Sequence, residues 1–310
     1  MVMKGLVYKS TGSWYKVRDN NGNFIVCRLK GKLRIKDLKV TNPVSVGDIV
    51  DFEMEKGKET GLISKINNRK NHLIRKSVNL SKQYHIIASN IDQAVLVATV
   101  THPNTLNEFI DRFLVSVTAY NIPAIILVNK LDLYKEEHLE HLADWNSIYQ
   151  KAGYTVLPIS VEKEINLDKV KTLFHKKTTV LSGNSGVGKS SLLKKLLPNE
   201  EISVKEISEI HQQGVHTTTF AEMYDLPNGG HLIDTPGIRG IGVVDIEPEE
   251  LSNYFPEFLK LKPQCKFNNC VHINEPHCAV KTALEDGEIA LSRYNSYLNI
   301  FNNDQEENYR

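Results

Sequence analysis

The chain has 310 residues, 41% hydrophobic and 24% charged, which is an ordinary composition for a globular protein and long enough for two or three domains. No hydrophobic run reaches the roughly 18 residues that a membrane-spanning helix needs, and the first residues lack the hydrophobic core and cleavage site of a signal peptide. We therefore expect a cytoplasmic protein with no membrane partner, and a monomer in the absence of any signal for assembly.

The net charge of +1 hides an uneven distribution. Residues 1–76 hold 17 Lys and Arg against 7 Asp and Glu, a balance of +10, whereas residues 77–250 hold 15 against 22, a balance of −7. The N-terminal segment is therefore suited to a polyanion. A solvated basic surface on a small domain would explain the same excess.

Residues 1–70 predict a small closed β-barrel of the OB type, because short strand patterns alternate with regular turn signals. The expected strands are residues 5–10, 14–19, 24–29, 46–54 and 61–66. Trp14, Tyr15 and Phe24 are either platforms on which bases stack or members of the barrel core, and the core interpretation is favoured for each. Cys27 is expected in the core, and residues 66–77 are expected to form a basic linker.

Residues 71–247 predict a doubly wound α/β domain, because continuous apolar strands alternate with helical patterns. The expected strands are residues 93–100, 124–130, 154–160, 178–183 and 231–237, with helices at 106–120 and 136–153. Ligands of such largely parallel sheets bind beyond the C-terminal strand ends. A third domain, 248–310, contains a helical apolar stripe formed by Ala290, Tyr294, Leu298 and Phe301. We expect this stripe to pack within its own domain, and a helix that binds a partner is the less favoured alternative.

Residues 183–190 match the phosphate-loop pattern GxxxxGK[ST], between an expected strand and an expected helix. The glycines let the backbone approach the phosphates, Lys189 reaches the β and γ oxygens, and Ser190 binds Mg²⁺. The candidate phosphate-binding residues are Ser182, Gly183, Asn184, Ser185, Gly186, Val187, Gly188, Lys189, Ser190 and Ser191.

Two further motifs complete a guanine-nucleotide site. Asp234 ends an expected strand, where it can hold Mg²⁺ through water, and the Gly237 amide can sense a γ-phosphate. In the Asn-Lys-x-Asp motif, the Asp132 carboxylate can accept both guanine donors, Lys130 covers the ring and Asn129 ties neighbouring loops together. The list of guanine-site residues is Asn129, Lys130, Asp132 and, in the supporting loop, Ser160.

The order of these motifs is unusual. The base-reading motif precedes the phosphate loop, whereas an ordinary Ras-like GTPase begins with its phosphate loop. Since loops from one sheet edge can surround a single nucleotide whatever the chain order, the sequence indicates a circular permutation.

Three cysteines and a histidine with short spacing, Cys265, Cys270, His272 and Cys278, predict a closed tetrahedral site for one structural Zn²⁺ per chain. His277 is a less favoured alternative for the fourth ligand.

With these motifs the chain resembles, over nearly its whole length, the circularly permuted ribosome small-subunit-dependent GTPase A family. The resemblance implies a barrel, a permuted GTPase domain and a zinc-binding helical domain. It also implies binding of GTP and GDP, and of the 30S ribosomal subunit with its 16S rRNA rather than DNA. The implied activity is slow GTP hydrolysis that the 30S subunit stimulates and that serves late maturation of the subunit and the protein's own release.

The family's first switch matches residues 214–220, except that Val215 stands where a basic residue is usual. A threonine here binds Mg²⁺ and the γ-phosphate, and we assign Thr218, with Thr217 and Thr219 as alternatives. Ile238 occupies the position of the water-orienting glutamine of Ras-like enzymes and cannot hydrogen-bond water. His216 is therefore the candidate catalytic residue beside Lys189 and Thr218, although a structural loop histidine is the alternative.

Two other functions stay open from the residues. A metal-handling GTPase would need an exchangeable metal site, which four saturating ligands do not favour. A non-catalytic RNA-binding module with a structural nucleotide site would not need the full set of phosphate, magnesium and base ligands.

Overall fold

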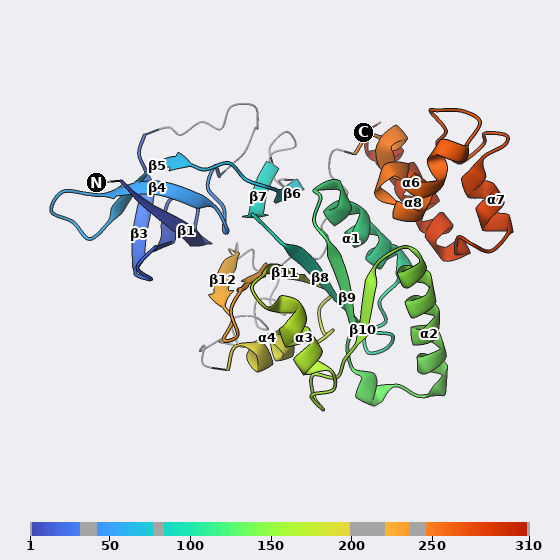
Figure 1. Ribbon diagram of the computed structural model, residues 1–310, viewed down its shortest axis with the longest axis horizontal. Coiled ribbons are helices and arrows are strands. Elements are labelled where there is room, and N and C mark those ends of the chain that lie inside the picture. The colour runs from blue at the N-terminus through green and yellow to red at the C-terminus, as the bar shows by residue number, and fades with distance from the viewer. Residues whose placement is uncertain (1, 32–41, 77–83, 199–220, 236–245, 309–310) are drawn as a thin grey trace. The chain divides into compact units, whose positions relative to one another are not determined.

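The computed structural model describes residues 2–31, 42–76, 84–198, 221–235 and 246–308 (Figure 1). The chain forms two compact units, which are described separately. Unit 1 comprises Met1–Val95, Leu167–Ser182 and Lys189–Arg239, and unit 2 comprises Leu96–Asn166, Gly183–Gly188 and Gly240–Arg310. None of the described helices is both long and apolar enough to cross a membrane.

The N-terminal strands of unit 1 close into a five-stranded barrel, as the sequence predicts. The strands are β1 (Met3–Ser10), β2 (Tyr15–Asp19), β3 (Phe24–Leu29), β4 (Ile49–Met54) and β5 (Gly61–Ile66). They pair in the order β1-β2-β3-β5-β4, and β4 pairs again with β1, which closes the barrel.

Of the three aromatic residues expected in the barrel core, Tyr15 lies in it. Tyr15 is buried with Val17, Cys27 and other residues of the cluster, so the core interpretation is confirmed for Tyr15 and Cys27. It is wrong for Trp14 and Phe24, which are 47% and 48% exposed. The reason is strand alternation, because successive side chains of a strand point to opposite faces.

The basic segment after the barrel is not the predicted linker. Residues 72–76 form β6 (His72–Lys76), which pairs antiparallel with β7 (Tyr84–Ser89). Before this hairpin, the guanidinium of Arg69 donates to both carboxylate oxygens of buried Asp48 at 2.6 Å, and the Ser89 hydroxyl donates to the same carboxylate at 2.6 Å. These charged contacts hold the start of residues 66–77 against the barrel, although the polar sequence of this segment is typical of a linker.

Unit 1 also contains part of the α/β sheet, in which β11 lies between β8 and β13. The elements are β8 (Gln93–Ala98), which continues into unit 2, β11 (Thr178–Ser182), β12 (Glu222–Asp225), β13 (His231–Asp234), α3 (Leu167–Phe174) and α4 (Lys189–Leu196). Strands β11 and β13 are parallel, whereas β12, which the sequence analysis missed, is antiparallel to β13 and pairs with β1 of the barrel.

Unit 2 contains the parallel pair β9 and β10 with helices alongside it (Figure 1). The elements are α1 (Asn107–Ala119), β9 (Ala124–Val128), η1 (Leu131–Leu133), α2 (Glu136–Lys151) and β10 (Thr155–Pro158). Helix α1 buries Ile110, Phe113, Leu114 and Val117, a spacing of three and four residues that places them on one face. The expected helices and strands are therefore present here.

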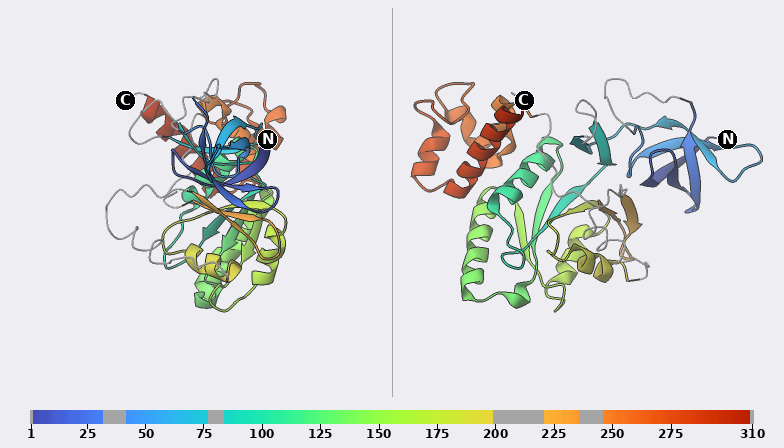
Figure 2. Two further views of the ribbon diagram at one scale, coloured as in Figure 1. Left: turned by 90° about the vertical axis from the view of Figure 1, so that its left-hand side faces the viewer. Right: turned by 180° about the vertical axis from the view of Figure 1, so that it is seen from behind.

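The C-terminal part of unit 2 is helical. It comprises η2 (Pro248–Tyr254), α6 (Pro256–Leu261), η3 (Lys262–Gln264), α7 (Ala279–Glu285) and α8 (Leu291–Asn308). Tyr294, Leu298 and Phe301 of the predicted stripe belong to one hydrophobic cluster with Phe258, but this cluster also includes Val115 of α1. Helix α8 lies alongside α1 (Figures 1 and 2), so the stripe does not pack only within its own region.

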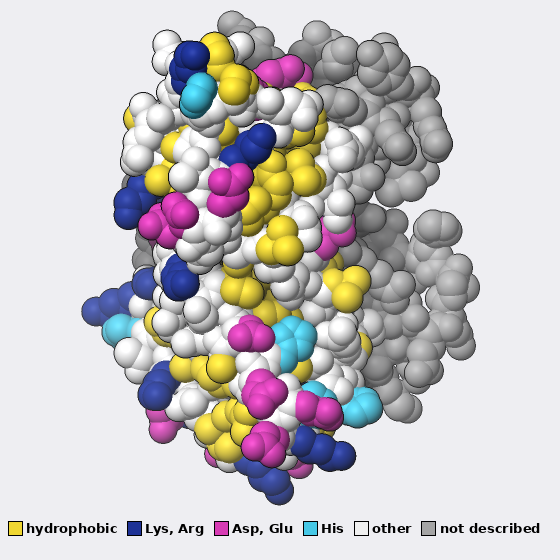
Figure 3. All heavy atoms as spheres, turned by 90° about the vertical axis from the view of Figure 1, so that its right-hand side faces the viewer, with side chains coloured by type: hydrophobic (Ala, Val, Ile, Leu, Met, Phe, Trp, Pro, Cys, Tyr) yellow, Lys and Arg dark blue, Asp and Glu magenta, His cyan; other side chains and the backbone are white. Residues whose placement is uncertain are grey.

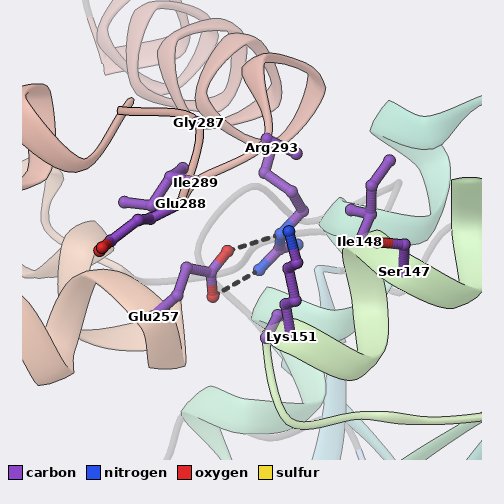
Figure 4. Close-up of a pocket in the computed structure, with 10 residues that line it drawn as sticks. Ser147, Ile148, Lys151, Glu257, Gly287, Glu288, Ile289 and Arg293 are labelled. Carbon is purple, nitrogen blue, oxygen red and sulfur yellow. Dashed lines mark hydrogen bonds and ion pairs between the residues drawn. The ribbon is translucent and has the colours of Figure 1, made fainter. Parts of the chain in front are cut away.

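A buried ion cluster joins the C-terminal helices to α1 and was not predicted. The Arg293 guanidinium donates to Glu257 at 2.7 and 3.1 Å and to Asp111 of α1 at 2.7 Å. Its side chain is 2% exposed, and that of Asp111 is fully buried. Figure 4 shows Arg293 facing Glu257, in a small cleft of about 60 Å³ that Lys151 of α2 also lines.

Replacing Arg293 should destabilise unit 2, because removing one member of a buried ion pair leaves an uncompensated charge. We expect Arg293→Met to lower the free energy of unfolding by about 3–5 kcal/mol, measured by urea denaturation of the full chain. Adding Asp111→Asn to this variant should restore part of the loss, since it removes one of the two carboxylates, Asp111 and Glu257, that have lost their partner.

The matched control is Arg112→Met. Arg112 pairs with Glu108 at 3.0 Å within α1, the helix of Asp111, and both side chains are partly exposed, so its loss should cost less than about 1 kcal/mol. Equal losses for Arg293→Met and Arg112→Met would contradict the importance of the buried cluster.

Candidate functional site

The phosphate loop of unit 2 has a backbone that requires glycine at two places. Gly183 has a φ of +143°, and a Cβ there would lie 2.3 Å from the carbonyl oxygen of Val97. Gly188 has a φ of +97°, and a Cβ there would lie 2.3 Å from the side-chain nitrogen of Asn129. Both the left-handed backbone and the close approach exclude a larger residue. Between them Val187 is buried, and Ser185 and Gly186 are exposed.

Asn129 connects this loop to two other segments. Its side-chain amide donates to the carbonyl of Val187 at 2.9 Å, and its amide oxygen accepts from the backbone N–H of Val161 at 3.1 Å. Its own backbone N–H donates to the carbonyl of Ala98 at 2.8 Å. Asn129 is 3% exposed, so these bonds are protected from water. One side chain thus fixes the base-reading motif, the loop after β10 and the phosphate loop relative to each other.

The remaining residues of the base-reading motif face the same loops. The Ser160 hydroxyl donates to one carboxylate oxygen of Asp132 and accepts from the backbone N–H of Lys163 at 3.0 Å. Lys130 has a left-handed backbone with φ of +67°, and its ammonium donates to the carbonyl of His102. Ser160 therefore orients the carboxylate that would read a base.

The other predicted nucleotide ligands belong to unit 1. Ser182 is buried at the end of β11, and Lys189, Ser190 and Ser191 form the first turn of α4. Asp234 is buried at the end of the neighbouring parallel strand β13. Burial raises the pKa of the Asp234 carboxyl, and the positive charge of Lys189 opposes this rise. A carboxylate and a lysine ammonium with this coupling suit a site for a metal ion and phosphates.

Some predicted residues lie outside the described residues. They are Gly237, His216, Thr217, Thr218, Thr219, Val215 and Ile238. Their roles therefore stay predictions from the sequence.

The sequence analysis missed Tyr134, which supports the base-reading loop. Its hydroxyl donates to the carbonyl of Asn129 at 2.6 Å and accepts from the backbone N–H of Val100 at 2.9 Å. Tyrosine in a loop after a strand has no motif that would reveal this role, because the partner at Val100 is distant in the chain.

The second candidate site is a cluster of one histidine and three cysteines in unit 2. Nδ1 of His272 lies 3.6, 3.4 and 3.3 Å from the sulfur atoms of Cys265, Cys270 and Cys278. Tetrahedral zinc with Zn–S near 2.3 Å and Zn–N near 2.0 Å separates nitrogen from sulfur by about 3.5 Å, so the spacing of these atoms fits a single metal ion.

Burial prepares this cluster for a metal. It lowers the pKa of His272 to about 4, which keeps the imidazole neutral, and raises the pKa of the Cys270 thiol to about 12. Buried thiols of this kind become ligands when a cation replaces their protons. The four residues, and not His277, form the group that could hold a metal among the described residues.

Hydrogen bonds from neighbouring residues hold the loop that carries His272. The hydroxyl of Tyr294 donates to the carbonyl of His272 at 2.7 Å, and that of Tyr297 donates to the carbonyl of Val271 at 2.5 Å. The Glu275 carboxylate accepts backbone N–H groups within the loop, including that of Val271 at 2.8 Å. Helix α8, which carries the buried Arg293, therefore also holds the loop of a candidate metal ligand.

Two family models match the chain. The model described as "RsgA N-terminal domain" matches residues 4–63, and the model described as "RsgA GTPase" matches residues 66–244. Together they cover the barrel and the segments that carry the base-reading motif and the phosphate loop.

Relatives match over nearly the whole chain. The "Small ribosomal subunit biogenesis GTPase RsgA" of Flavobacterium johnsoniae is 55% identical over 310 residues, covering 99% of this chain and 95% of the relative. The relative of the same name from Bacteroides fragilis is 47% identical over 308 residues, covering 99% of each.

Two solved structures are also similar. YjeQ from Thermotoga maritima has a TM-score of 0.79 at 34% identity and covers 98% of both chains. YloQ, described as a circularly permuted GTPase, has a TM-score of 0.77 at 33% identity, covering 99% of this chain and 96% of the other. From the family models, the relatives and these structures together, we conclude that the chain belongs to the RsgA family of circularly permuted GTPases.

Proposed function

We propose that the protein is a cytoplasmic GTPase that binds the small ribosomal subunit and couples GTP hydrolysis to late maturation of that subunit and to its own release. The proposal rests on sequence identities of 55% and 47%, over 99% of this chain, with relatives named for small-subunit biogenesis. In this proposal residues 1–70 bind RNA, residues 71–247 bind and hydrolyse GTP, and residues 248–310 bind zinc.

The proposed nucleotide site consists of the residues that the sequence motifs predict. Asp132 accepts the two donors of the guanine edge while Ser160 holds its carboxylate, and Lys130 covers the ring. The loop from Gly183 to Gly188 and the start of α4 offer backbone N–H groups to the phosphates, and Lys189 adds a charge. What supports this proposal is the hydrogen bonding of Asn129 to the phosphate loop and the burial of Asp234.

Hydrolysis needs Mg²⁺ and an oriented water molecule. Ser190 and Thr218 would bind the ion directly and Asp234 through water, and the bound ion supplies positive charge to the phosphate oxygens. We assign the orientation of water to His216, because Ile238 cannot form a hydrogen bond with it. Because the site lacks a glutamine that orients water, we expect the protein alone to hydrolyse GTP slowly, on the order of 10⁻⁴ to 10⁻² per second. A partner that orders the loop around His216 would accelerate it.

RNA is the partner that the charge distribution supports. Residues 1–76 carry a balance of +10, which suits the phosphates of 16S rRNA. Residues 77–250 instead carry a balance of −7. On the face of the molecule that Figure 3 draws, acidic and basic side chains are interspersed, which is typical of a solvated surface.

We assign one structural Zn²⁺ to Cys265, Cys270, His272 and Cys278. Four protein ligands leave no open position for a substrate, and the burial of three of them argues against an exchangeable metal. The ion would hold together the loops between η3 and α7. This assignment also disfavours the metal-handling alternative.

The proposal predicts that purified 30S subunits raise the GTP hydrolysis rate by on the order of 10²-fold, measured as phosphate release under multiple turnover. Lys189→Ala should abolish both basal and stimulated rates. His216→Ala should keep nucleotide binding but lose most of the stimulation, since it removes the group that orients water.

Lys194→Ala serves as the control for Lys189→Ala, because it removes a lysine of the same helix farther from the phosphate loop. A rate that 30S subunits leave unchanged for the unmodified protein would overturn the proposed function. Normal stimulation of His216→Ala would overturn only the role of that residue.

The zinc assignment predicts one zinc ion per purified chain by elemental analysis. Cys270→Ser should reduce the zinc content and lower the unfolding temperature, because metal binding contributes directly to folding. Cys27→Ser is the matched control. Cys27 is also a buried cysteine, but it lies in the barrel and should leave the zinc content unchanged. Full zinc occupancy of Cys270→Ser would contradict the assignment.

A further inference from the structure

A cleft on the barrel of unit 1 is not used by the nucleotide site or the zinc site. Its volume is about 260 Å³, and it lies where the end of β1 meets β2 and β3. The lining residues that carry the argument are Trp14, Lys16, Phe24 and Val26. Its walls therefore combine aromatic and aliphatic side chains with a cation.

The strand register explains why these side chains gather outside the core. In the antiparallel pair β2 and β3, Lys16 lies opposite Val26 and Arg18 lies opposite Phe24, and alternation turns all four away from the barrel interior. Trp14, Phe24 and Val26 are 47%, 48% and 49% exposed. Three adjoining apolar side chains that remain half exposed are typical of a binding surface.

The cations around the cleft differ in their partners. Lys9 pairs with Glu222 at 2.8 Å, and Arg18 pairs with Asp225 at 2.5 Å. The ammonium of Lys16 instead lies 4.4 Å from the centre of the Phe24 ring, and it has no ion pair with the residues that the structure describes. Lys16 thus offers positive charge beside the exposed aromatic faces.

We infer that this cleft binds one unpaired base of single-stranded RNA, which stacks on Trp14 and contacts Phe24 and Val26 while its phosphate lies beside Lys16. The inference rests on the proposed function, since it names how the barrel grips RNA. A nucleotide combines the apolar face of its base with an anionic phosphate, and the cleft offers exposed aromatic side chains for the first and the Lys16 ammonium for the second. An apolar protein surface would satisfy the aromatic side chains but leave Lys16 unpaired.

The chain itself contains a probe for the test, because it has two tryptophans and only Trp14 is exposed. Subtracting the fluorescence of Trp14→Phe from that of the unmodified chain isolates the Trp14 signal without altering buried Trp145. We expect a short oligouridylate to quench this signal. An abasic ribose-phosphate chain of the same length and charge should not quench it.

Affinity provides the second readout. Trp14→Ala should weaken oligouridylate binding by about 5- to 150-fold, the range found for loss of one stacked base. Met54→Ala is the matched control, since Met54 is 42% exposed on β4 of the same barrel but lies outside the cleft, and it should leave affinity unchanged.

Three results would overturn the inference. The first is quenching by the abasic chain equal to that by the oligouridylate, and the second is equal affinity of Trp14→Ala and the unmodified protein for the oligouridylate. The third is quenching by 30S subunits without quenching by the oligouridylate, which would indicate docking on a protein or on paired RNA. Stimulation of GTP hydrolysis by 30S subunits, measured on the same preparation, separates the two proposals. If stimulation persists when the Trp14 signal is silent, only the base-binding inference fails.

Discussion

The side chain of Asn129 is the constraint on which the candidate nucleotide-binding segments of unit 2 depend. It bonds to Val187 and Val161, residues 58 and 32 positions away in the chain, and it leaves no room for a side chain at Gly188. A base-reading loop and a phosphate loop that are separate in sequence become one rigid arrangement. This explains how a permuted chain can keep the chemistry of a GTPase, because the contacts between loops, and not their order, define the arrangement.

A second set of contacts links α1, which follows the end of β8, to the C-terminal helices. Arg293 of α8 bonds to Asp111 of α1 and to Glu257 of α6, while Tyr294 of the same helix bonds to the loop that carries His272. Helix α8 thus connects a helix of the GTPase segment with the candidate metal site. Rigid contacts of this kind give the proposed GTPase a physical route for coupling between the two regions.

The sequence predicted what local patterns determine. The five barrel strands follow from alternating residues and turns, and the positions of Asn129, Asp132 and the phosphate loop follow from motifs whose residues are close in the chain. It could not predict contacts between distant residues. From the sequence alone Arg293 would be assigned to the surface, because its buried partner Asp111 is 182 positions away in the chain.

Strand assignments failed for similar reasons. Strand β6 lies in a basic segment, its partner β7 is distant enough in the chain to escape the local pattern, and the residues before β6 are held by the remote pair of Arg69 and Asp48. The short strand β12 is recognisable only once β13 and β1 are available to pair with it. Trp14 directly precedes buried Tyr15, the first residue of β2, and adjacent residues of an extended chain point to opposite faces, so the two side chains could not both lie in the core.

The most direct test of the central claim compares two alanine substitutions in the phosphate loop by equilibrium binding of GDP. Gly186 and Gly188 both have positive φ, of +83° and +97°, so alanine strains the backbone at both. Only at Gly188 would the new Cβ strike the Asn129 side chain, whereas at Gly186 its nearest neighbour is Pro103 at 3.4 Å. The account predicts that Gly188→Ala weakens GDP binding by at least about tenfold more than Gly186→Ala. Equal losses would show that the contact with Asn129 does not hold the site together.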